Sequence, residues 1–223
     1  MTAFLALLRR DLSLAWREGG AVGTALGFYL VVVSVLPFGV GADLALLTRM
    51  APGVLWVALL LAALLSMGRL FESDSEDGSI EAIAMGPLPL ELVVTAKCLA
   101  HWISTVIPLV LAAPVLGLLL NLELDAYGVL LATMLAGTPA VSFIGSVGAA
   151  LTLRARRAGL LVALIIMPLY VPTLVFGISA MGAAVSGMPG FQSAFLILTA
   201  LSLASVALAP IATAAALRLQ LQS

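Results

Sequence analysis

The chain has 223 residues, of which 63% are hydrophobic and only 9% are charged, and its mean hydropathy is +1.22. This composition excludes a water-soluble globular protein, and no segment is basic enough to indicate nucleic-acid binding. The formal net charge of -1 excludes little, because in a membrane protein the distribution of Lys and Arg is more informative than their sum.

The first segment in chain order, residues 1–18, is predicted to be an amphipathic helix in the membrane interface. One face is apolar and carries Phe4, Leu5, Leu8, Leu12 and Trp16. The other face is polar and carries Arg9, Arg10, Ser13 and Arg17. The apolar run is too short for a cleavable signal peptide, so we expect the segment to be retained. It either anchors the chain beside anionic lipid or transmits motion to the first span.

Six apolar stretches follow, each long enough to cross a bilayer whose hydrocarbon core is roughly 30 Å thick. They occupy about 21–40, 51–68, 92–120, 127–153, 159–186 and 194–217. The third and fifth exceed one bilayer thickness, so they tilt, kink, project into water or contain a re-entrant piece. Kinks are expected at Pro108, Pro114, Pro168 and Pro172. The sequence therefore predicts an all-α integral membrane protein with one transmembrane domain over 1–223.

The positive charges predict the orientation. With the amino terminus in the cytoplasm, nine of the ten Lys and Arg residues lie on the cytoplasmic side: Arg9, Arg10, Arg17, Arg69, Lys97, Arg154, Arg156, Arg157 and Arg218. Only Arg49 is then outside, and six spans place the carboxyl terminus in the cytoplasm as well. The outer loops, near 41–50, 121–126 and 187–193, are too short for a binding domain. Other chains must supply any folded machinery.

The densest polar feature lies between the second and third spans, where residues 72–81 hold five carboxylates. Asp77 and Ser79 are candidate N-caps for one short helix that Gly86-Pro87 would end. A calcium loop is excluded, because aligning Gly78 with the turn glycine puts Ala84 where a bidentate Glu is needed. Two interpretations stay open: a solvated acidic loop, or a docking element for a cytoplasmic partner with a basic, partly apolar groove.

His101 is the only histidine and the candidate functional polar residue of the spans. A lone His near the inner boundary is more often a hydrogen-bonded packing residue than a ligand. Metal sites need several ligands, and the spans offer only Cys98 besides His101 and no carboxylate, so we expect no directly bound metal or cofactor. The lack of intramembrane carboxylates also argues against an ion-coupled transporter.

No catalytic motif is present. Ser146 and Ser186 lie far from His101 in sequence, which argues against an intramembrane serine protease. The sole lysine, Lys97, follows Ala96 rather than a glycine, so there is no P-loop, and any ATP hydrolysis belongs to a partner chain.

Small residues recur at helical spacing at Gly19, Gly23 and Gly27, and again at Gly145 and Ala149. Such faces let helices approach closely. They indicate either packing inside one bundle or a seam between two copies of the chain.

Taken together, an amphipathic first helix, six spans and an acidic inner helix resemble the membrane subunit of an ABC transporter of the ABC-2 class. The amino-acid sequence of several stretches gives a more specific resemblance than the topology does. These stretches are residues 69–79, 86–91, Lys97 with 100–102, 137–139 and 168–172. In these the chain is similar to the haem exporter protein B family, CcmB, of bacterial cytochrome c maturation. The likeness runs from residues 7–11 to the carboxyl terminus.

The resemblance implies a non-catalytic permease subunit in the bacterial inner membrane. Its expected partners are a CcmA-like ATPase subunit, a second copy of itself, CcmC-like and CcmD-like membrane proteins, and a CcmE-like haem chaperone. Partner ATP hydrolysis would drive haem export or the release of haem-loaded chaperone on the periplasmic side. The alternatives are an ABC-2 permease for another amphipathic substrate and a membrane scaffold that uses no energy.

The resemblance also implies that a cytoplasmic coupling segment, residues 72–90, contacts the ATPase. The docking residues it implies are Phe71, Glu72, Ser73, Asp74, Glu76, Asp77, Gly78, Ile80 and Glu81. Haem-ligating residues of that system belong to partner chains, so none is expected here, and haem is a candidate substrate only.

Overall fold

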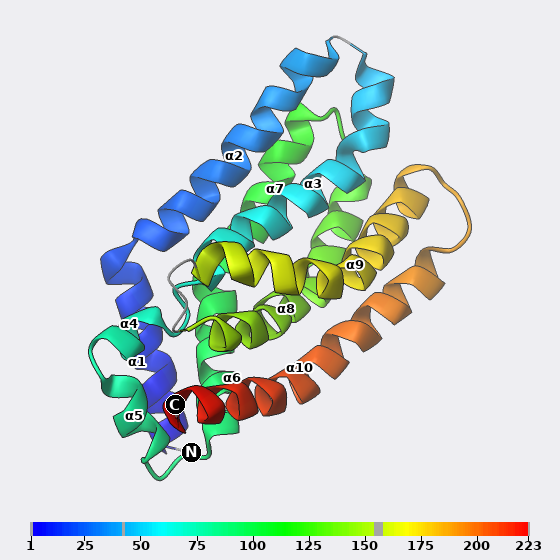
Figure 1. Cartoon of the computed structure of the whole chain (residues 1–223). Helices are drawn as coiled ribbons and strands as arrows, with labels where there is room; N and C mark the ends of the chain where they lie inside the picture. Colours follow the sequence, from blue (N-terminus) through cyan, green and yellow to red (C-terminus); the bar gives the residue numbers. More distant parts are fainter. Residues whose placement is uncertain (1, 42, 154–157, 223) are drawn as a thin grey trace.

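The computed structural model describes residues 2–41, 43–153 and 158–222, and every regular element among them is a helix (Figure 1). Six helical stretches in this part are long and apolar enough to cross a membrane. The predicted all-α fold with six spans is therefore confirmed. The cations at 154, 156 and 157 lie outside the described residues, and the single domain over 1–223 stays a prediction.

The helices follow one another with short connections. They are α1 Thr2–Glu18, α2 Gly20–Val40, α3 Leu44–Met67, α4 Glu72–Glu76, α5 Ser79–Ala84, α6 Leu90–His101, the π-helix η1 Trp102–Val106, α7 Ile107–Leu119, α8 Ala126–Leu151, α9 Ala158–Val185 and α10 Phe191–Gln222. Helix α8 is central, since it packs against α3, α7, α9 and α10. Helices α1, α4 and α5 gather with both chain termini at one end of the molecule (Figure 1).

The second span is longer than its apolar run. Helix α3 begins at Leu44 rather than near Ala51, and the Asp43 carboxylate accepts a hydrogen bond from the Leu46 N–H at 3.0 Å. Arg49 and Pro52 interrupt the apolar pattern but not the helix, because a cation one to two turns from a helix end can reach the membrane surface. The predicted outer loop at 41–50 is consequently much shorter.

The third span is one continuous helical run from Leu90 to Leu119, not a re-entrant loop. Its irregularity is a π-helix, Trp102–Val106, in which the Ile107 N–H donates to the Trp102 carbonyl five residues back. Pro108 follows directly and has no N–H for a carbonyl of the preceding turn, which favours a change of hydrogen-bond pattern here. The irregularity thus precedes the proline rather than coinciding with it.

The centre of the bundle is organised around Trp56, which is fully buried. Gly137 of α8 and Gly177 of α9 both face this indole, and a Cβ atom at either position would lie 2.7 Å from a ring carbon. Gly145 likewise abuts Met67 and Tyr170. Glycine is therefore required where these helices meet.

The two small-residue faces differ in what surrounds them. Gly145 lies inside the bundle, as the intrachain interpretation predicted. Gly23 and Gly27 of α2 have open space where a Cβ would stand. The α2 face with Gly23 and Gly27 is therefore not packed against another helix of the same chain at these positions. An interface between two copies of the chain at this face stays a prediction.

Candidate functional site: an acidic segment held by a buried ion-pair cluster

The acidic segment forms two short helices instead of the one predicted. Gly78 separates α4 from α5 with a φ of 73°, a left-handed conformation that favours glycine. The Ser79 N–H donates to Asp77 Oδ1 at 2.9 Å. Hydrogen bonds from the Ser79 hydroxyl and N–H lower the pKa of the exposed Asp77 carboxyl, so this residue carries its negative charge down to acidic pH.

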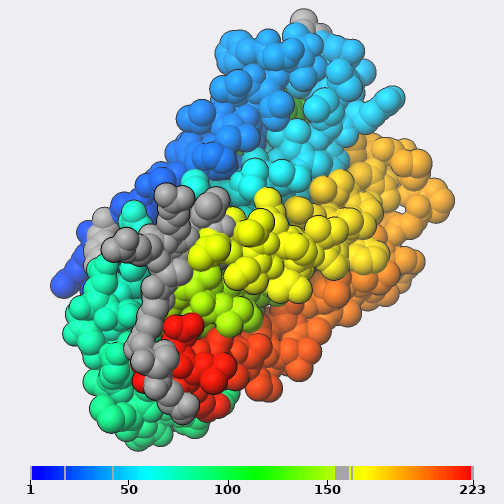
Figure 2. Space-filling model, in the orientation of Figure 1, coloured from blue at the N-terminus to red at the C-terminus, as the bar shows by residue number. Residues whose placement is uncertain are grey.

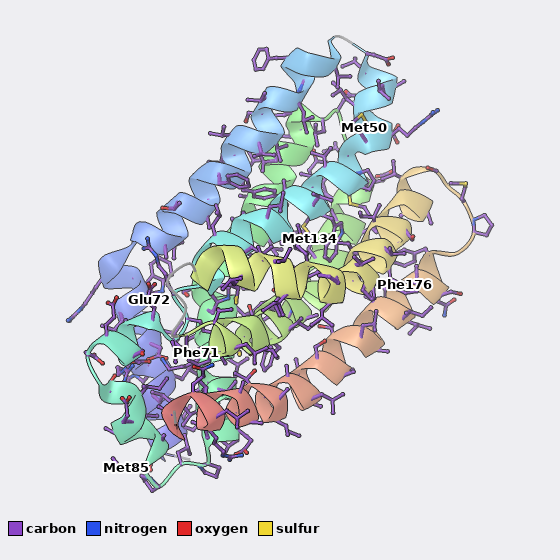
Figure 3. The ribbon with its side chains drawn as sticks, in the orientation of Figure 1. Met50, Phe71, Glu72, Met85, Met134 and Phe176 are labelled. Atoms are coloured by element: carbon purple, nitrogen blue, oxygen red, sulfur yellow. The ribbon has the colours of Figure 1, made fainter. Side chains whose placement is uncertain are left out.

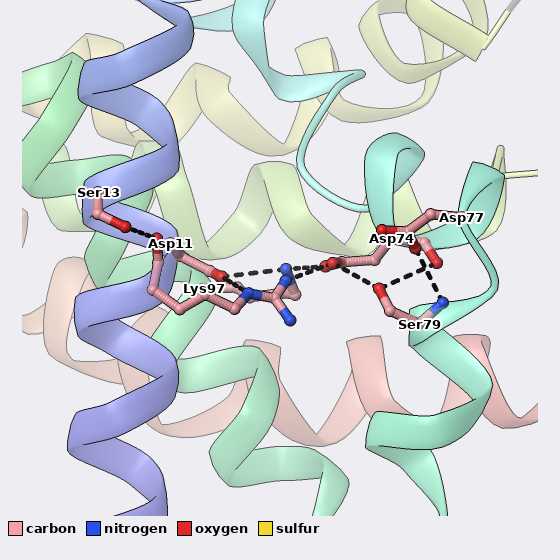
Figure 4. Close-up of polar contacts among 7 residues, drawn as sticks. Asp11, Ser13, Asp74, Asp77, Ser79 and Lys97 are labelled. Atoms are coloured by element: carbon pink, nitrogen blue, oxygen red, sulfur yellow. Dashed lines mark hydrogen bonds and ion pairs between the residues drawn. The ribbon is translucent and has the colours of Figure 1, made fainter.

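Asp74 points away from solvent into a group of opposite charges (Figure 4). Its two carboxylate oxygens contact the Arg10 guanidinium and the Lys97 ammonium. The Lys97 Nζ also lies 3.1 Å from Asp11 Oδ2, and Arg10 Nε lies 3.0 Å from Asp11 Oδ1. Arg10, Asp11, Asp74 and Lys97 are called the ion-pair cluster below.

The cluster balances two positive against two negative charges, and its members are buried to different degrees: the Asp11 side chain is 11% and the Arg10 side chain 36% exposed. Asp74 is 2% exposed and Lys97 5%, and Ser79 Oγ donates a further hydrogen bond to Asp74 Oδ1 at 2.9 Å. Buried charges require such pairing, because each loses its hydration on burial. The cluster therefore ties three separate elements, α1, α4 and α6, into one unit.

The structure divides the predicted docking residues into two sets. Glu72, Ser73, Glu76, Asp77, Gly78 and Glu81 are exposed. Phe71, Asp74 and Ile80 are buried at 1%, 2% and 3%, because Phe71 and Ile80 pack into an apolar cluster with α6 and α10. These three side chains are packed or paired within the chain and hold the segment in place. Figure 3 shows Glu72 and Met85 at this end of the molecule and Met50 at the other.

Arg10 and Asp11 were not predicted as site residues. Arg10 was predicted to lie on the polar face of an interfacial helix, and α1 packs along α6 so that Arg10 lies beside Asp74. Asp11 carried a signal that was missed. It lies at helical spacing from the apolar Phe4, Leu8 and Ala15, so a carboxylate stands within an apolar face. A charge at such a position indicates a buried partner.

His101 links three helices. Its Nε2 lies 2.8 Å from Ser66 Oγ of α3, and its Nδ1 lies 2.9 Å from Ser142 Oγ of α8. The next residue, Trp102, donates from its indole N–H to Thr138 Oγ1 at 3.1 Å. No group of His, Cys, Asp and Glu able to hold a metal occurs in the described part of the chain. Both ring nitrogens thus serve helix packing.

A cavity of about 450 Å³ joins these features, opening between α1, the start of α2, the end of α3 and α6. Asp11 and Lys97 of the ion-pair cluster line it, and His101, Ser104 and Thr105 extend it into the third span. Its walls are polar on several sides, so it can hold water. The cavity also borders the π-helix. It therefore lies between the ion-pair cluster and the irregular part of the third span.

Replacing His101 by Leu is expected to lower the free energy of unfolding by about 1–3 kcal/mol, because the Ser142 hydroxyl loses its partner inside the bundle. Thermal unfolding in detergent measures this. The control is Thr95→Ala on the same helix, since Thr95 Oγ1 bonds only a carbonyl of its own helix at 2.8 Å. An unchanged unfolding temperature together with lost cellular activity would contradict a packing role.

Comparison with known proteins gives the family. The family model described as CcmB protein matches residues 2–220 of the chain. The chain is 50% identical to the "Heme exporter protein B" of Bradyrhizobium diazoefficiens over 98% of both chains, and 52% identical to that of Paracoccus denitrificans over 97% of this chain and 99% of the relative. The protein of the same name from Escherichia coli strain K12 is 40% identical over 98% and 99%.

Such identities extend over nearly the whole length of the chain, and they agree with the resemblance expected from residues 69–79 and 168–172. The relatives also match in length, because 98% or more of each of these three is covered. The chain therefore belongs to the CcmB protein family.

Proposed function

We propose that this chain is the non-catalytic membrane subunit of a haem-export complex, in which a separate ATPase subunit docks on the acidic segment and drives motion of the spans. The observation that carries the docking step is the exposed row of carboxylates on α4 and α5, held rigidly on α1 and α6 by the ion-pair cluster. The haem assignment rests on the names of the relatives, each a "Heme exporter protein B". Haem is the substrate in this proposal and not a bound cofactor.

The cluster gives the docking surface a mechanical connection. When the ATPase subunits close, they push α4 and α5, and Asp74 passes that displacement to Arg10 on α1 and Lys97 on α6. Two nearby irregularities can absorb it: Gly19, at a φ of 54° between α1 and α2, and the π-helix of the third span. The push therefore reaches the first and third spans together.

Such coupling has a thermodynamic requirement. The two states of the spans must differ in affinity for a ligand on the far side, here haem or a CcmE-like chaperone that carries it. The complex we propose also holds a second copy of this chain and CcmC-like and CcmD-like membrane proteins. It lies in the bacterial inner membrane with both termini of this chain in the cytoplasm, which the gathering of α1, α4, α5 and the carboxyl terminus at one end supports (Figure 1).

Reversing the exposed charges with Glu72→Lys, Glu76→Lys and Asp77→Lys is expected to weaken ATPase binding about 100-fold, because like charges across an interface cost several kcal/mol. Copurification of the ATPase and its activity measure the effect. Asp74 is left intact, because its reversal would disrupt the ion-pair cluster.

The matched control is Glu123→Lys with Asp125→Lys, since these exposed carboxylates follow α7 at the opposite end. Unchanged copurification and activity in the triple variant would overturn docking at this segment. Loss of ATPase coupling with normal c-type cytochromes would instead favour a permease for another amphipathic substrate. A chain that never copurifies with an ATPase would favour a scaffold without energy coupling.

A further inference from the structure

A second opening lies at the end of the molecule away from the acidic segment. There α2, α3 and α9 border an open groove of about 540 Å³, and Figure 2 shows these helices on one face of the molecule. The groove walls are apolar and include Val32, Leu36, Val57, Leu61 and Ile178. Its volume lies within the roughly 300–1,000 Å³ range of small-molecule sites.

Arg49 is the single charged residue that lines this groove. Its side chain is exposed, and no ion pair joins it to a carboxylate of the described residues. In the predicted orientation it is also the one cation assigned to the outer side of the membrane. A lone guanidinium beside an apolar groove suits a ligand with an anionic head and an apolar tail.

The dimensions of the groove fit one membrane leaflet. Its lining residues on α3 run from Arg49 to Leu61, a rise of about 18 Å at 1.5 Å per residue. Half of a hydrocarbon core of roughly 30 Å is about 15 Å. A chain that starts at Arg49 thus reaches the middle of the bilayer along the groove.

We propose that this groove binds an anionic phospholipid, with one acyl chain along α3 and the phosphate on the Arg49 guanidinium. Arg pairs with phosphate through two parallel N–H donors, a geometry that Lys does not offer. Two glycines, Gly53 and Gly182, line the groove with open space at their Cβ positions. They keep its floor free of side chains and so leave room for the acyl chain.

Native mass spectrometry of the purified chain, with phosphatidylglycerol or phosphatidylcholine of the same acyl chains added, tests the site. Arg49→Gln is expected to lower phosphatidylglycerol affinity about fivefold. Phosphatidylcholine affinity is expected to fall less, because its phosphate charge is balanced by its own choline cation. Gly53→Leu with Gly182→Leu is expected to remove one bound lipid of either kind by filling the groove.

The control for the filled groove is Gly128→Leu, an exposed helical position that also has open space but lies outside the groove. Thermal unfolding of each variant checks that it is folded. An unchanged phosphatidylglycerol preference in Arg49→Gln would overturn the proposal, as would unchanged lipid binding in the filled variant. Displacement of the lipid by haem but not by inorganic phosphate, with tighter haem binding, would reassign the groove to haem.

Discussion

Replacing Lys97 by Met is expected to lower the free energy of unfolding by about 3–5 kcal/mol, the usual cost of removing one partner from a buried ion pair. Lys97 is 5% exposed and contacts both Asp11 and Asp74. Without it, Asp11 and Asp74 share the partly exposed Arg10, and Asp74 keeps its charge in a buried position. Chemical or thermal unfolding in detergent measures the loss, and ATPase coupling is expected to fall with it.

The control for this variant is Arg218→Met. Arg218 pairs with Glu91 at 2.6 Å, but its side chain is 53% exposed. An exposed pair contributes only about 0–1 kcal/mol, so this variant is expected to unfold almost like the unaltered chain. Equal losses in the two variants would contradict a buried cluster.

A double-mutant cycle separates pairing from packing. Asp74→Asn combined with Lys97→Met removes one charge of each sign, so the cluster stays neutral. The double variant is expected to lose at least 1 kcal/mol less than the sum of the two single losses. Strict additivity would mean that the two side chains do not interact.

Replacing Gly177 by Val is expected to lower the free energy of unfolding by about 3 kcal/mol. A Cβ atom at Gly177 lies 2.7 Å from the Trp56 ring, and the indole cannot withdraw because Gly137 faces it from α8. Overpacking of this kind costs about 1–3 kcal/mol or more. Thermal unfolding in one detergent gives the measurement.

Gly182→Val is the matched control, because it lies five residues further along the same helix and has open space at its Cβ position. Its expected change is only the small helix-propensity difference, which slightly favours Val over Gly. Trp56→Leu in the Gly177→Val background is expected to recover part of the stability by making room. A Gly177→Val variant as stable as Gly182→Val would contradict the close approach of α3 and α9.

Local signals in the sequence were enough for the spans, but they predicted one short helix in the acidic segment, where the structure has α4 and α5. Apolar runs of bilayer length predict crossing helices, since every backbone polar group must be satisfied within the segment. They fail where a helix continues past the apolar run. Arg49 and Pro52 hid the first two turns of α3, because a charged residue and a proline both break the pattern of an apolar helix.

The site was only half predictable, since its decisive contacts join residues far apart in the chain. The acidic segment can be recognised from consecutive residues. Arg10 and Asp74, in contrast, are 64 positions apart in the sequence, and His101 and Ser142 are 41 apart. Periodicity gives the face of a helix but not the helix that covers it. The buried carboxylate of the segment could therefore be identified only from the packing of α1 on α6.

The ion-pair cluster also constrains how the chain enters the membrane during synthesis. Arg10 precedes the first span, Asp74 follows the second, and Lys97 stands near the start of the third. These groups meet only if α2 and α3 cross the membrane as a hairpin, because residue 74 then lies on the same side of the membrane as residue 10. A chain with one misinserted helix would leave a carboxylate on the other side of the membrane from its cations, so the cluster forms only when the first three spans are inserted in register.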